Sequence, residues 1–384
     1  MVKNILYVCP SSGIGGAETF LISTAKHHNR EKFSPHYLLF RDGPLKASLE
    51  RHNAPVYVLQ KPPRLSRPLS HSQCSGEMTR VIEERRISLV HSTMAYGALF
   101  SWRVCKQKSI LHCWFQHGPA SGWMDRWAGR LYHQLLLTNS QYTTQTQMDL
   151  ESSLFFPKTK KRILKQIPLG TDPMEFTFEA RKQLKKNLLD AHSLPENTLT
   201  VAMLCRIQPW KGVHLFLAAL RELKNSSFPV AGFVWGDPFG DSEYCEGLKQ
   251  KAQQENIPVH FMGNTDTPHL ALQTSDVLVN ASTQPEPFGL SIIEAMANGT
   301  AVVVPKAGGP KDIIEEGLSG LFFEPNNFKD LAQALQKLTD DSTLLQLQQG
   351  AHQRFSSHFL ADRMVGDLEA AYDQCAKQYG ISHA

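Results

Sequence analysis

Short apolar runs alternate with longer amphipathic stretches along nearly the whole chain. The short runs predict strands, because a strand buried on both faces reads as a continuous hydrophobic segment. In the first half we expect strands at 5–9, 37–40, 56–59, 88–91, 111–116 and 135–139. In the second half we expect them at 200–204, 230–234, 259–262, 277–280, 301–304 and 320–323.

The longer stretches carry apolar residues every three or four positions, which predicts helices. We expect these helices at 17–28, 76–86, 212–224, 243–255, 290–297, 310–316 and 328–338. The tail from 362 to 377 has the same amphipathic pattern, and we expect it to be a helix that packs back on the first domain. Alternation of strands and helices indicates an α/β protein with parallel sheets covered on both faces.

The alternation forms two series of similar length, which indicates two Rossmann-like domains. A chain of 384 residues is also longer than one hydrophobic core usually supports. Proline and glycine punctuate the chain at Pro168-Leu-Gly-Thr-Asp-Pro173, and we place the boundary there. The predicted domains are 1–168 with about 360–384, and 169–359.

Composition narrows the class of protein. No apolar run reaches the ~18–20 residues that a membrane-spanning helix needs. The apolar run near the N-terminus is too short for a signal peptide and is better explained as a strand. The 7 cysteines are scattered without a C-x-x-C pair, which indicates reduced thiols rather than a disulfide framework. We therefore expect a cytoplasmic protein.

Charge is distributed unevenly between the two halves. Residues 1–175 carry 23 Lys and Arg against 12 Asp and Glu, and the remainder carries 17 against 24. The basic half predicts attraction to an anionic acceptor or to the anionic inner face of a membrane, where the protein would bind peripherally. The alternative is an ordinary solvated surface. No nucleic-acid motif is present, and we expect no nucleic-acid partner.

The strongest motif runs from Glu286 through Pro-Phe-Gly-Leu-Ser-Ile-Ile to Glu294. Gly289 and Leu290 stand where a loop becomes a helix, and the free N–H groups of a first helical turn attract phosphate. A carboxylate beside a diphosphate is repelled unless it binds a neutral polyol instead. The two ends of a nucleotide-sugar, the sugar and the ribose, offer such polyols, so this motif predicts an activated-sugar site.

Two cations follow the strand at 200–204. Arg206 and Lys211-Gly212 would lie at the carboxyl edge of the sheet, where ligands bind in open α/β folds. Charge-assisted hydrogen bonds from both would stabilise a departing diphosphate. The alternative is a surface loop with ordinary cations.

The first half offers weaker candidates. Gly15 and Gly16 lie between the first strand and the first helix, where glycine lets a ligand approach the backbone, although a tight turn explains them as well. The run resembles a dinucleotide fingerprint incompletely, because Glu18 occupies the third glycine position. His117 follows the strand at 111–116 and is a functional candidate, whereas His91 is more simply explained as a structural histidine.

No Asp-x-Asp pair occurs in the chain, although a divalent ion bridging a diphosphate usually requires paired carboxylates. We therefore expect no metal site, and charge stabilisation by arginine, lysine and helix dipoles.

Together these motifs resemble the family 4 retaining glycosyltransferases, which have the GT-B architecture. Gly15-Gly-Ala-Glu18 resembles the family's glycine loop, and the segment 167–172 resembles its interdomain segment. Arg206 with Lys211-Gly212 matches its diphosphate-binding pair, and Glu286 with Glu294 matches its E-x7-E motif. The departures are Asp312 for a glutamate, Cys205 for a common glycine and Leu169 for a common asparagine.

The resemblance implies two Rossmann-like domains facing each other across a cleft. It also implies transfer of a hexose from a nucleotide-diphospho-sugar, with retention and without a cofactor, to a glycan or lipid-linked acceptor in cell-surface glycan or lipopolysaccharide synthesis. Glu294 would bind the ribose, Glu286 the sugar hydroxyls, and the N–H groups of Gly289 and Leu290 the diphosphate or sugar. The implied catalytic residues are Glu286, His117, Arg206 and Lys211. The implied donor-binding residues are Gly15, Gly16, Arg206, Lys211, Gly289, Leu290 and Glu294.

Three alternatives remain open from the sequence. A GT-B nucleotide-sugar epimerase would turn over the donor without an acceptor. A nicotinamide-dependent dehydrogenase would use the glycine turn after the first strand. A catalytically silent sugar-binding or lipid-binding subunit would not need Glu286 for its role. The sequence names neither the nucleotide nor the acceptor.

Overall fold

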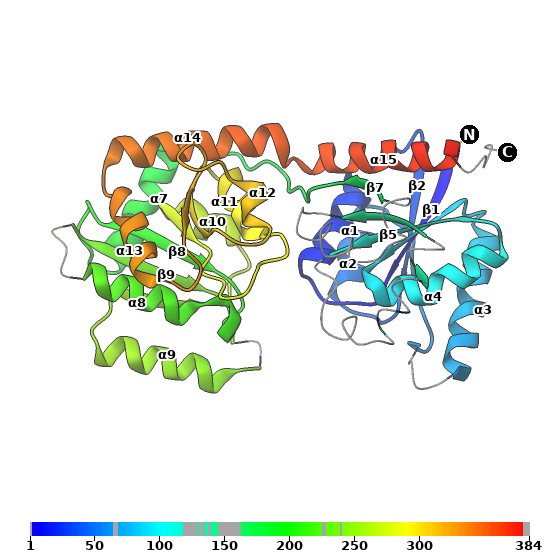
Figure 1. Ribbon diagram of the computed structural model, residues 1–384, viewed down its shortest axis with the longest axis horizontal. Helices are drawn as coiled ribbons and strands as arrows, with labels where there is room; N and C mark the ends of the chain where they lie inside the picture. The colour runs from blue at the N-terminus through cyan, green and yellow to red at the C-terminus, as the bar shows by residue number, and fades with distance from the viewer. Residues whose placement is uncertain are drawn as a thin grey trace. The chain divides into compact units, whose positions relative to one another are not determined.

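The computed structural model divides the chain into two compact units (Figure 1), and each is described by itself. Unit 1 comprises Met1–Gly170 and Ala361–Ala384, and unit 2 comprises Thr171–Leu360. The structure describes residues 2–63, 68–117, 129, 131, 135–136, 140–144, 163–224, 228–238 and 240–378.

Unit 1 is built on a parallel sheet with the strand order β3-β2-β1-β4-β5-β6-β7. Its strands are β1 (Lys3–Cys9), β2 (Phe33–Leu39), β3 (Val56–Val58), β4 (Leu89–Thr93), β5 (Leu111–Gln116), β6 (Gln141–Thr144) and β7 (Ile163–Gln166). The central β1 lies between β2 and β4, with Ile5 opposite Pro35 on one side and Leu89 on the other. Because both faces of β1 are covered, Ile5 to Cys9 are fully buried.

The described helices of unit 1 are α1 (Gly16–His27), α2 (Pro44–Glu50), α3 (Pro68–Glu84), α4 (Met94–Gln107) and α15 (Ala361–Gln378). The C-terminal α15 returns to this unit and lies against α1. Buried polar contacts attach it: Tyr372 Oη lies 2.9 Å from Tyr7 Oη, and Glu369 Oε1 lies 2.8 Å from His28 Nδ1.

Unit 2 has a second parallel sheet with the order β10-β9-β8-β11-β12-β13. Its strands are β8 (Leu199–Leu204), β9 (Val230–Trp235), β10 (Val259–Gly263), β11 (Val277–Val279), β12 (Ala301–Pro305) and β13 (Leu321–Phe323). Its helices are α7 (Phe178–Ala191), η3 (Pro209–Lys211), α8 (Val213–Leu223), α9 (Ser242–Gln254), α10 (Pro268–Gln273), α11 (Leu290–Ala297), α12 (Pro310–Ile313), α13 (Phe328–Lys337) and α14 (Asp341–His358).

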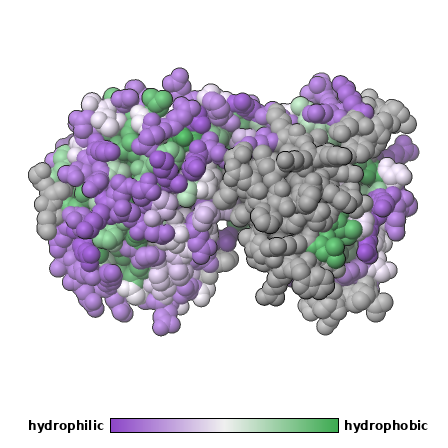
Figure 2. Space-filling model, in the orientation of Figure 1, coloured by the Kyte–Doolittle hydropathy of each residue, from purple (hydrophilic) through white to green (hydrophobic). Residues whose placement is uncertain are grey.

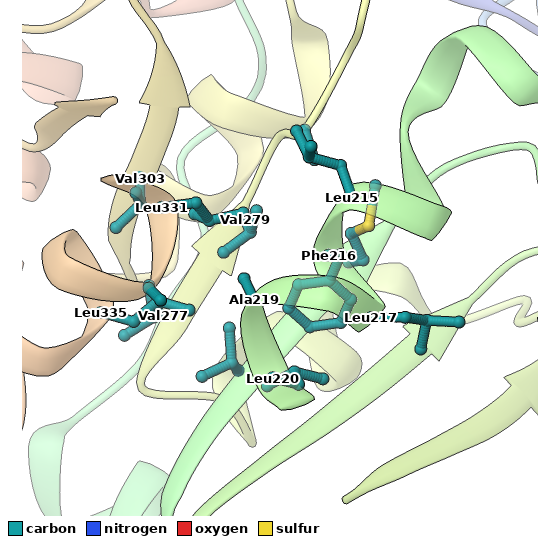
Figure 3. Close-up of a cluster of buried hydrophobic side chains, with 14 of the residues drawn as sticks. Leu215, Phe216, Leu217, Ala219, Leu220, Val277, Val279, Val303, Leu331 and Leu335 are labelled. Atoms are coloured by element: carbon teal, nitrogen blue, oxygen red, sulfur yellow. The ribbon is translucent and has the colours of Figure 1, made fainter. Parts of the chain in front are cut away.

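The core of unit 2 shows why its strands read as apolar runs (Figure 3). Phe216 and Leu220 of α8 lie in one buried cluster with Val277 and Val279 of β11 and with Leu335 of α13. Each such side chain contributes about 1.5–3 kcal/mol when fully buried. The cluster therefore fixes two helices against the sheet and holds the strand ends in register.

The α/β class and the two parallel, Rossmann-like sheets predicted from the sequence are confirmed. One expected strand, at 135–139, is wrong at its start, because 135–136 are helical, while 137–139 lie outside the described residues. The strands β6 and β7 and the helices α2, α4, α7, α10 and α14 were not predicted. Helix α3 begins at Pro68 rather than at 76, and α12 ends at Ile313 rather than at 316.

On the face shown in Figure 2, hydrophilic side chains cover most of the described surface of unit 2, and hydrophobic ones form small separate areas. Within the part of the chain that the structure describes, no helix is both long and apolar enough to cross a membrane.

Candidate functional site

The sequence-predicted residues of unit 2 gather at the carboxyl ends of three neighbouring strands. The chain runs from β8 outward to β9 and β10 and then returns to place β11 on the other side of β8. This reversal is a topological switch point, where open α/β sheets form their ligand crevice. The loops after β8, β11 and β12 therefore meet at one edge of the sheet, and they carry Lys211, Glu286 and Gly308.

The loop after β8 delivers Lys211 through a tight turn. After Pro209–Lys211 the chain passes through Gly212 at φ 74°, a left-handed conformation that favours glycine. A Cβ on Gly212 would lie 1.8 Å from the carbonyl oxygen of Ala281, in the loop after β11. The two loops approach so closely that only glycine fits.

Lys211 and Glu286 form an ion pair at the centre of this edge. Lys211 Nζ lies 2.6 Å from Glu286 Oε2, with side-chain exposures of 18% and 11%. Ser282 Oγ donates to the same oxygen at 2.9 Å. The indole ring of Trp210 lies 4.0 Å from Lys211 Nζ, within the range of a cation–π contact. A carboxylate and an ammonium are thus held together in a partly buried setting.

Two glycines that follow β12 pack against the loop that carries Glu286. The N–H of Gly309 donates to the carbonyl oxygen of Glu286 at 2.8 Å. A Cβ on Gly308, which has φ 64°, would lie 2.6 Å from that same oxygen. Gly308 and Gly309 therefore fix the backbone of Glu286.

Helix α11 begins beside this carboxylate. Its N-cap is Gly289, at φ 110°, and no side chain caps the first turn. A Cβ on Gly289 would lie 3.7 Å from Glu286 Cγ, so the two residues are in contact range. The backbone N–H groups at the start of a helix carry a partial positive charge and bind anions. The helix start, with Leu290 as its first residue, thus lies next to the Lys211–Glu286 pair.

Arg206 follows the same strand end. It is exposed. Burial raises the pKa of Cys205 to about 12, while Lys211 lowers that pKa and Glu286 raises it. The backbone of Arg206 lies just beyond β8, at the edge of the sheet whose loops carry Lys211 and Glu286.

Glu294 lies one turn into α11 and lines a cavity of about 170 Å³. The rest of the lining comes from Thr171, Asp172, Met174, Pro268, His269, Leu272, Ala297 and Asn298. Burial raises the pKa of the Glu294 carboxyl. No described residue donates a hydrogen bond to that carboxyl, so its oxygens are available to a ligand that enters the cavity.

In unit 1, the predicted residues lie at the ends of β1 and β5. Gly15 is the N-cap of α1 and Gly16 its first residue. The ring of His117 lies 4.6 Å from that of Phe115 and 5.3 Å from that of Phe20, between centroids. Because Phe20 belongs to α1, His117 and the glycine turn are brought to the same part of unit 1.

His91 behaves as a structural histidine. It is fully buried, and its Nδ1 lies 2.5 Å from Tyr372 Oη of α15. Desolvation by burial lowers its pKa well below the ordinary value. It therefore belongs to the polar network that attaches α15 to the sheet.

Sequence reasoning did not identify Ser282 or Trp210, which hold the two charged side chains. A serine in a polar loop and a tryptophan beside a proline carry no local signal for such a role. Both gain it only because β8 and β11 are neighbours. In the described part of the chain, no three His, Cys, Asp or Glu side chains are grouped so as to hold a metal ion.

Comparison with known proteins bears on the family and on the fold. Residues 185–354 match the family model described as Glycosyl transferases group 1. A glycosyltransferase structure from Rickettsia africae superposes with a TM-score of 0.86 at 20% identity, covering 98% of this chain and 99% of that one. The Anabaena Alr3699/HepE structure in complex with UDP and glucose gives 0.81 at 23%, covering 96% and 99%. These likenesses show the GT-B fold.

Among curated proteins, the chain is similar to the D-inositol 3-phosphate glycosyltransferase of Corynebacterium urealyticum. The two are 30% identical over 217 residues, which cover 54% of this chain and 50% of that protein. The chain spans about half the length of the curated relatives it matches.

Proposed function

We propose that this chain, whose residues 185–354 match the model of the group 1 glycosyl transferases, transfers a hexose from a nucleotide-diphospho-sugar to an acceptor hydroxyl with retention of anomeric configuration. The observation that carries the proposal is the contact between Lys211 and Glu286 beside the uncapped start of α11. This contact brings a cation, a carboxylate and a helix N-terminus together. A sugar diphosphate can bind all three, because its phosphates attract the cation and the helix N-terminus and its sugar hydroxyls can donate to the carboxylate.

The diphosphate binds where charge is already arranged for it. The N–H groups after Gly289 and the side chains of Arg206 and Lys211 donate to its oxygens. Preorganised donors of this kind stabilise the negative charge that grows on the leaving group. Since these cations are supplied by the chain, we propose that the reaction is metal-independent and that a chelator leaves it unchanged.

The nucleoside takes the cavity beside Glu294. The unpaired carboxyl accepts hydrogen bonds from the ribose hydroxyls, which replace the water lost on burial. The Anabaena neighbour, whose structure contains UDP and glucose, supports a UDP-hexose as the donor.

Glu286 orients the hexose through its hydroxyls. The bond between the anomeric carbon and the phosphate oxygen breaks, and its electron pair leaves with the diphosphate. The acceptor oxygen then bonds to the anomeric carbon from the same face, and its proton passes to the departing phosphate oxygen. Glu286 stays unmodified and stabilises the positive charge that develops on the sugar.

For unit 1 we propose a role on the acceptor side, and the family resemblance assigns Gly15 and Gly16 to phosphate binding and His117 to sugar binding. The basic first half favours a glycan or lipid-linked acceptor at an anionic inner membrane face. Binding of the protein to vesicles of anionic phospholipid that weakens as the salt concentration rises would support this location. Binding that does not depend on the salt concentration would contradict it.

Purified protein should first be screened for thermal stabilisation by UDP, GDP, ADP and their hexose derivatives. A ligand present at 100 times its Kd raises stability by about 2.7 kcal/mol. The best donor is then incubated with and without candidate acceptors. Transfer by the wild type and its loss in Glu286→Gln, with donor binding retained, are the expected results. Turnover of donor alone would identify an epimerase instead, and full activity of the variant would exclude the assigned role of Glu286.

A further inference from the structure

We infer that Ser282 is a positioning residue for Glu286, and that it sets the direction of the carboxylate oxygen that meets the sugar. The inference rests on the proposed function. Ser282 is 3% exposed, and its hydroxyl donates to the Glu286 carboxylate at 2.9 Å.

Both protein donors to this carboxylate converge on one oxygen. Lys211 Nζ and Ser282 Oγ reach Oε2 at 2.6 Å and 2.9 Å. Among the described residues, none donates to Oε1. Two donors on one oxygen stop the carboxylate from rotating, so Oε1 keeps a fixed direction and a free lone pair. A neutral hydroxyl of a hexose is the ligand class that this oxygen can accept.

Ser282 matters most once the donor is bound. Lys211 is also one of the cations assigned to the diphosphate, so its ammonium is shared between Glu286 and the diphosphate once the donor is bound. The Ser282 hydroxyl carries no charge for the diphosphate to attract and remains on Oε2. It is then the donor that holds the carboxylate while the glycosidic bond breaks.

The backbone of Ser282 is fixed independently of its hydroxyl. Its N–H donates to Asn280 Oδ1 at 3.1 Å. The next residue, Thr283, donates to the carbonyl oxygen of Trp210 through its N–H at 2.8 Å and its hydroxyl at 3.2 Å. Removing the Ser282 hydroxyl therefore leaves the loop in place and tests the hydrogen bond alone.

The test compares Ser282→Ala with Ser282→Thr and a matched control, Ser275→Ala. Ser275 is 1% exposed in the same unit, and its hydroxyl bonds only to the carbonyl oxygen of Ala271, at 2.9 Å. We expect S282A to lower kcat by about 10- to 100-fold, as loss of a hydrogen bond to a charged group does, with KM and Kd for the donor nearly unchanged. S282T should recover most of the loss, and S275A should keep full activity.

Wild-type kcat in S282A overturns the inference, as does a loss of kcat matched by an equal loss in S275A. A crystal structure of S282A gives a readout that does not depend on turnover. We expect the Glu286 carboxylate to rotate from its wild-type direction, and an unchanged carboxylate would contradict the inference. A wild type that transfers no sugar contradicts the proposed function, whereas an active wild type with an active S282A contradicts only the role of Ser282.

Discussion

Two glutamates of one motif experience opposite surroundings. Glu286 is paired with Lys211 and accepts from Ser282, whereas Glu294 is partly buried and its carboxyl has no hydrogen-bond partner among the described residues. An ionised carboxylate without compensation costs free energy when it is buried. The first glutamate therefore has hydrogen-bond partners in the free protein, and we propose that the second finds its partner in a bound ligand.

Glu294→Gln should stabilise the free protein near neutral pH. The folded pKa of Glu294 is raised, so ionisation above the unfolded pKa of about 4.3 penalises the folded state. The penalty disappears as the pH falls through the folded pKa and the carboxyl takes up its proton. Denaturant unfolding should thus find the variant more stable at pH 7, with the difference closing near pH 4. Equal stability of Glu294→Gln and the wild type at pH 7 would contradict the absence of a partner for the Glu294 carboxylate. Tighter binding of the donor nucleotide by the variant would contradict the proposal that Glu294 binds the ribose.

Lys211→Met should lose both stability and donor affinity. A matched control exists, because Lys185 Nζ lies 2.6 Å from Asp276 Oδ2, with side-chain exposures of 24% and 11%. Breaking either partly buried pair should cost about 1–3 kcal/mol by urea unfolding, since a carboxylate is left uncompensated. Only K211M should weaken binding of the donor diphosphate, measured by calorimetry. Equal binding losses in K211M and Lys185→Met would show a general effect of destabilisation.

At the scale of elements, the site depends on loops that approach within van der Waals contact. Gly212 meets the loop after β11, and Gly308 and Gly309 meet the loop of Glu286. These contacts hold the three loops together beyond the ends of the paired strands. Their glycines are required by both space and backbone conformation.

Gly212→Ala should be far more damaging than Gly317→Ala. Both glycines are left-handed, at φ 74° and 73°, so both variants carry the backbone strain of about 1–2 kcal/mol. A Cβ on Gly317 meets nothing within 4 Å, whereas one on Gly212 lies 1.8 Å from the Ala281 carbonyl oxygen. Thermal unfolding should give a small loss for G317A and a much larger one for G212A, with loss of donor binding. Similar melting temperatures for the two would contradict the close approach of the loops.

The elements that sequence reasoning found are those with a strong local pattern. Strands such as β8 and β12 are continuous apolar runs, and α11 was predicted with the bounds that the structure has. Helix α4 was missed because it is buried on several sides, at Ala95, Gly97, Phe100 and Ser101 among others, which removes its amphipathic stripe. Strand β6 is polar, Gln-Tyr-Thr-Thr, and its pairing with β5 depends on the tertiary fold.

For the whole molecule, the two units should respond to acid in opposite ways. Unit 1 buries His28, His91 and His112 in neutral form, and desolvation lowers the pKa of each, that of His112 to about 3. The Glu369 carboxylate partly offsets this for His28. In unit 2, burial raises the pKa of the Glu294 carboxyl instead. The unit 2 histidines with lowered pKa values, His214 and His260, are only partly buried.

Unit 1 should therefore unfold first as the pH falls. A histidine with a lowered folded pKa takes up its proton in the unfolded state first, so stability is lost below the unfolded pKa of about 6.5. The loss reaches about 1.4 kcal/mol per pH unit for each histidine. Hydrogen exchange followed peptide by peptide from pH 7.5 to 5 should show faster exchange in β1, β4 and α15 before β8 and β11. Earlier opening of unit 2 would contradict this order.

The sequence by itself determined the α/β class, the two series of parallel strands, and the charged residues of the site, because these depend on periodicity and on motifs within short windows. Only the tertiary structure decided which of those residues touch. Lys211 and Glu286 are far apart in the sequence and meet because β8 and β11 are neighbours, and Tyr372 reaches Tyr7 because α15 returns to unit 1. Ser282 acquires its role in the same way. Such contacts follow from long-range strand order and loop packing, which no local pattern of residues encodes.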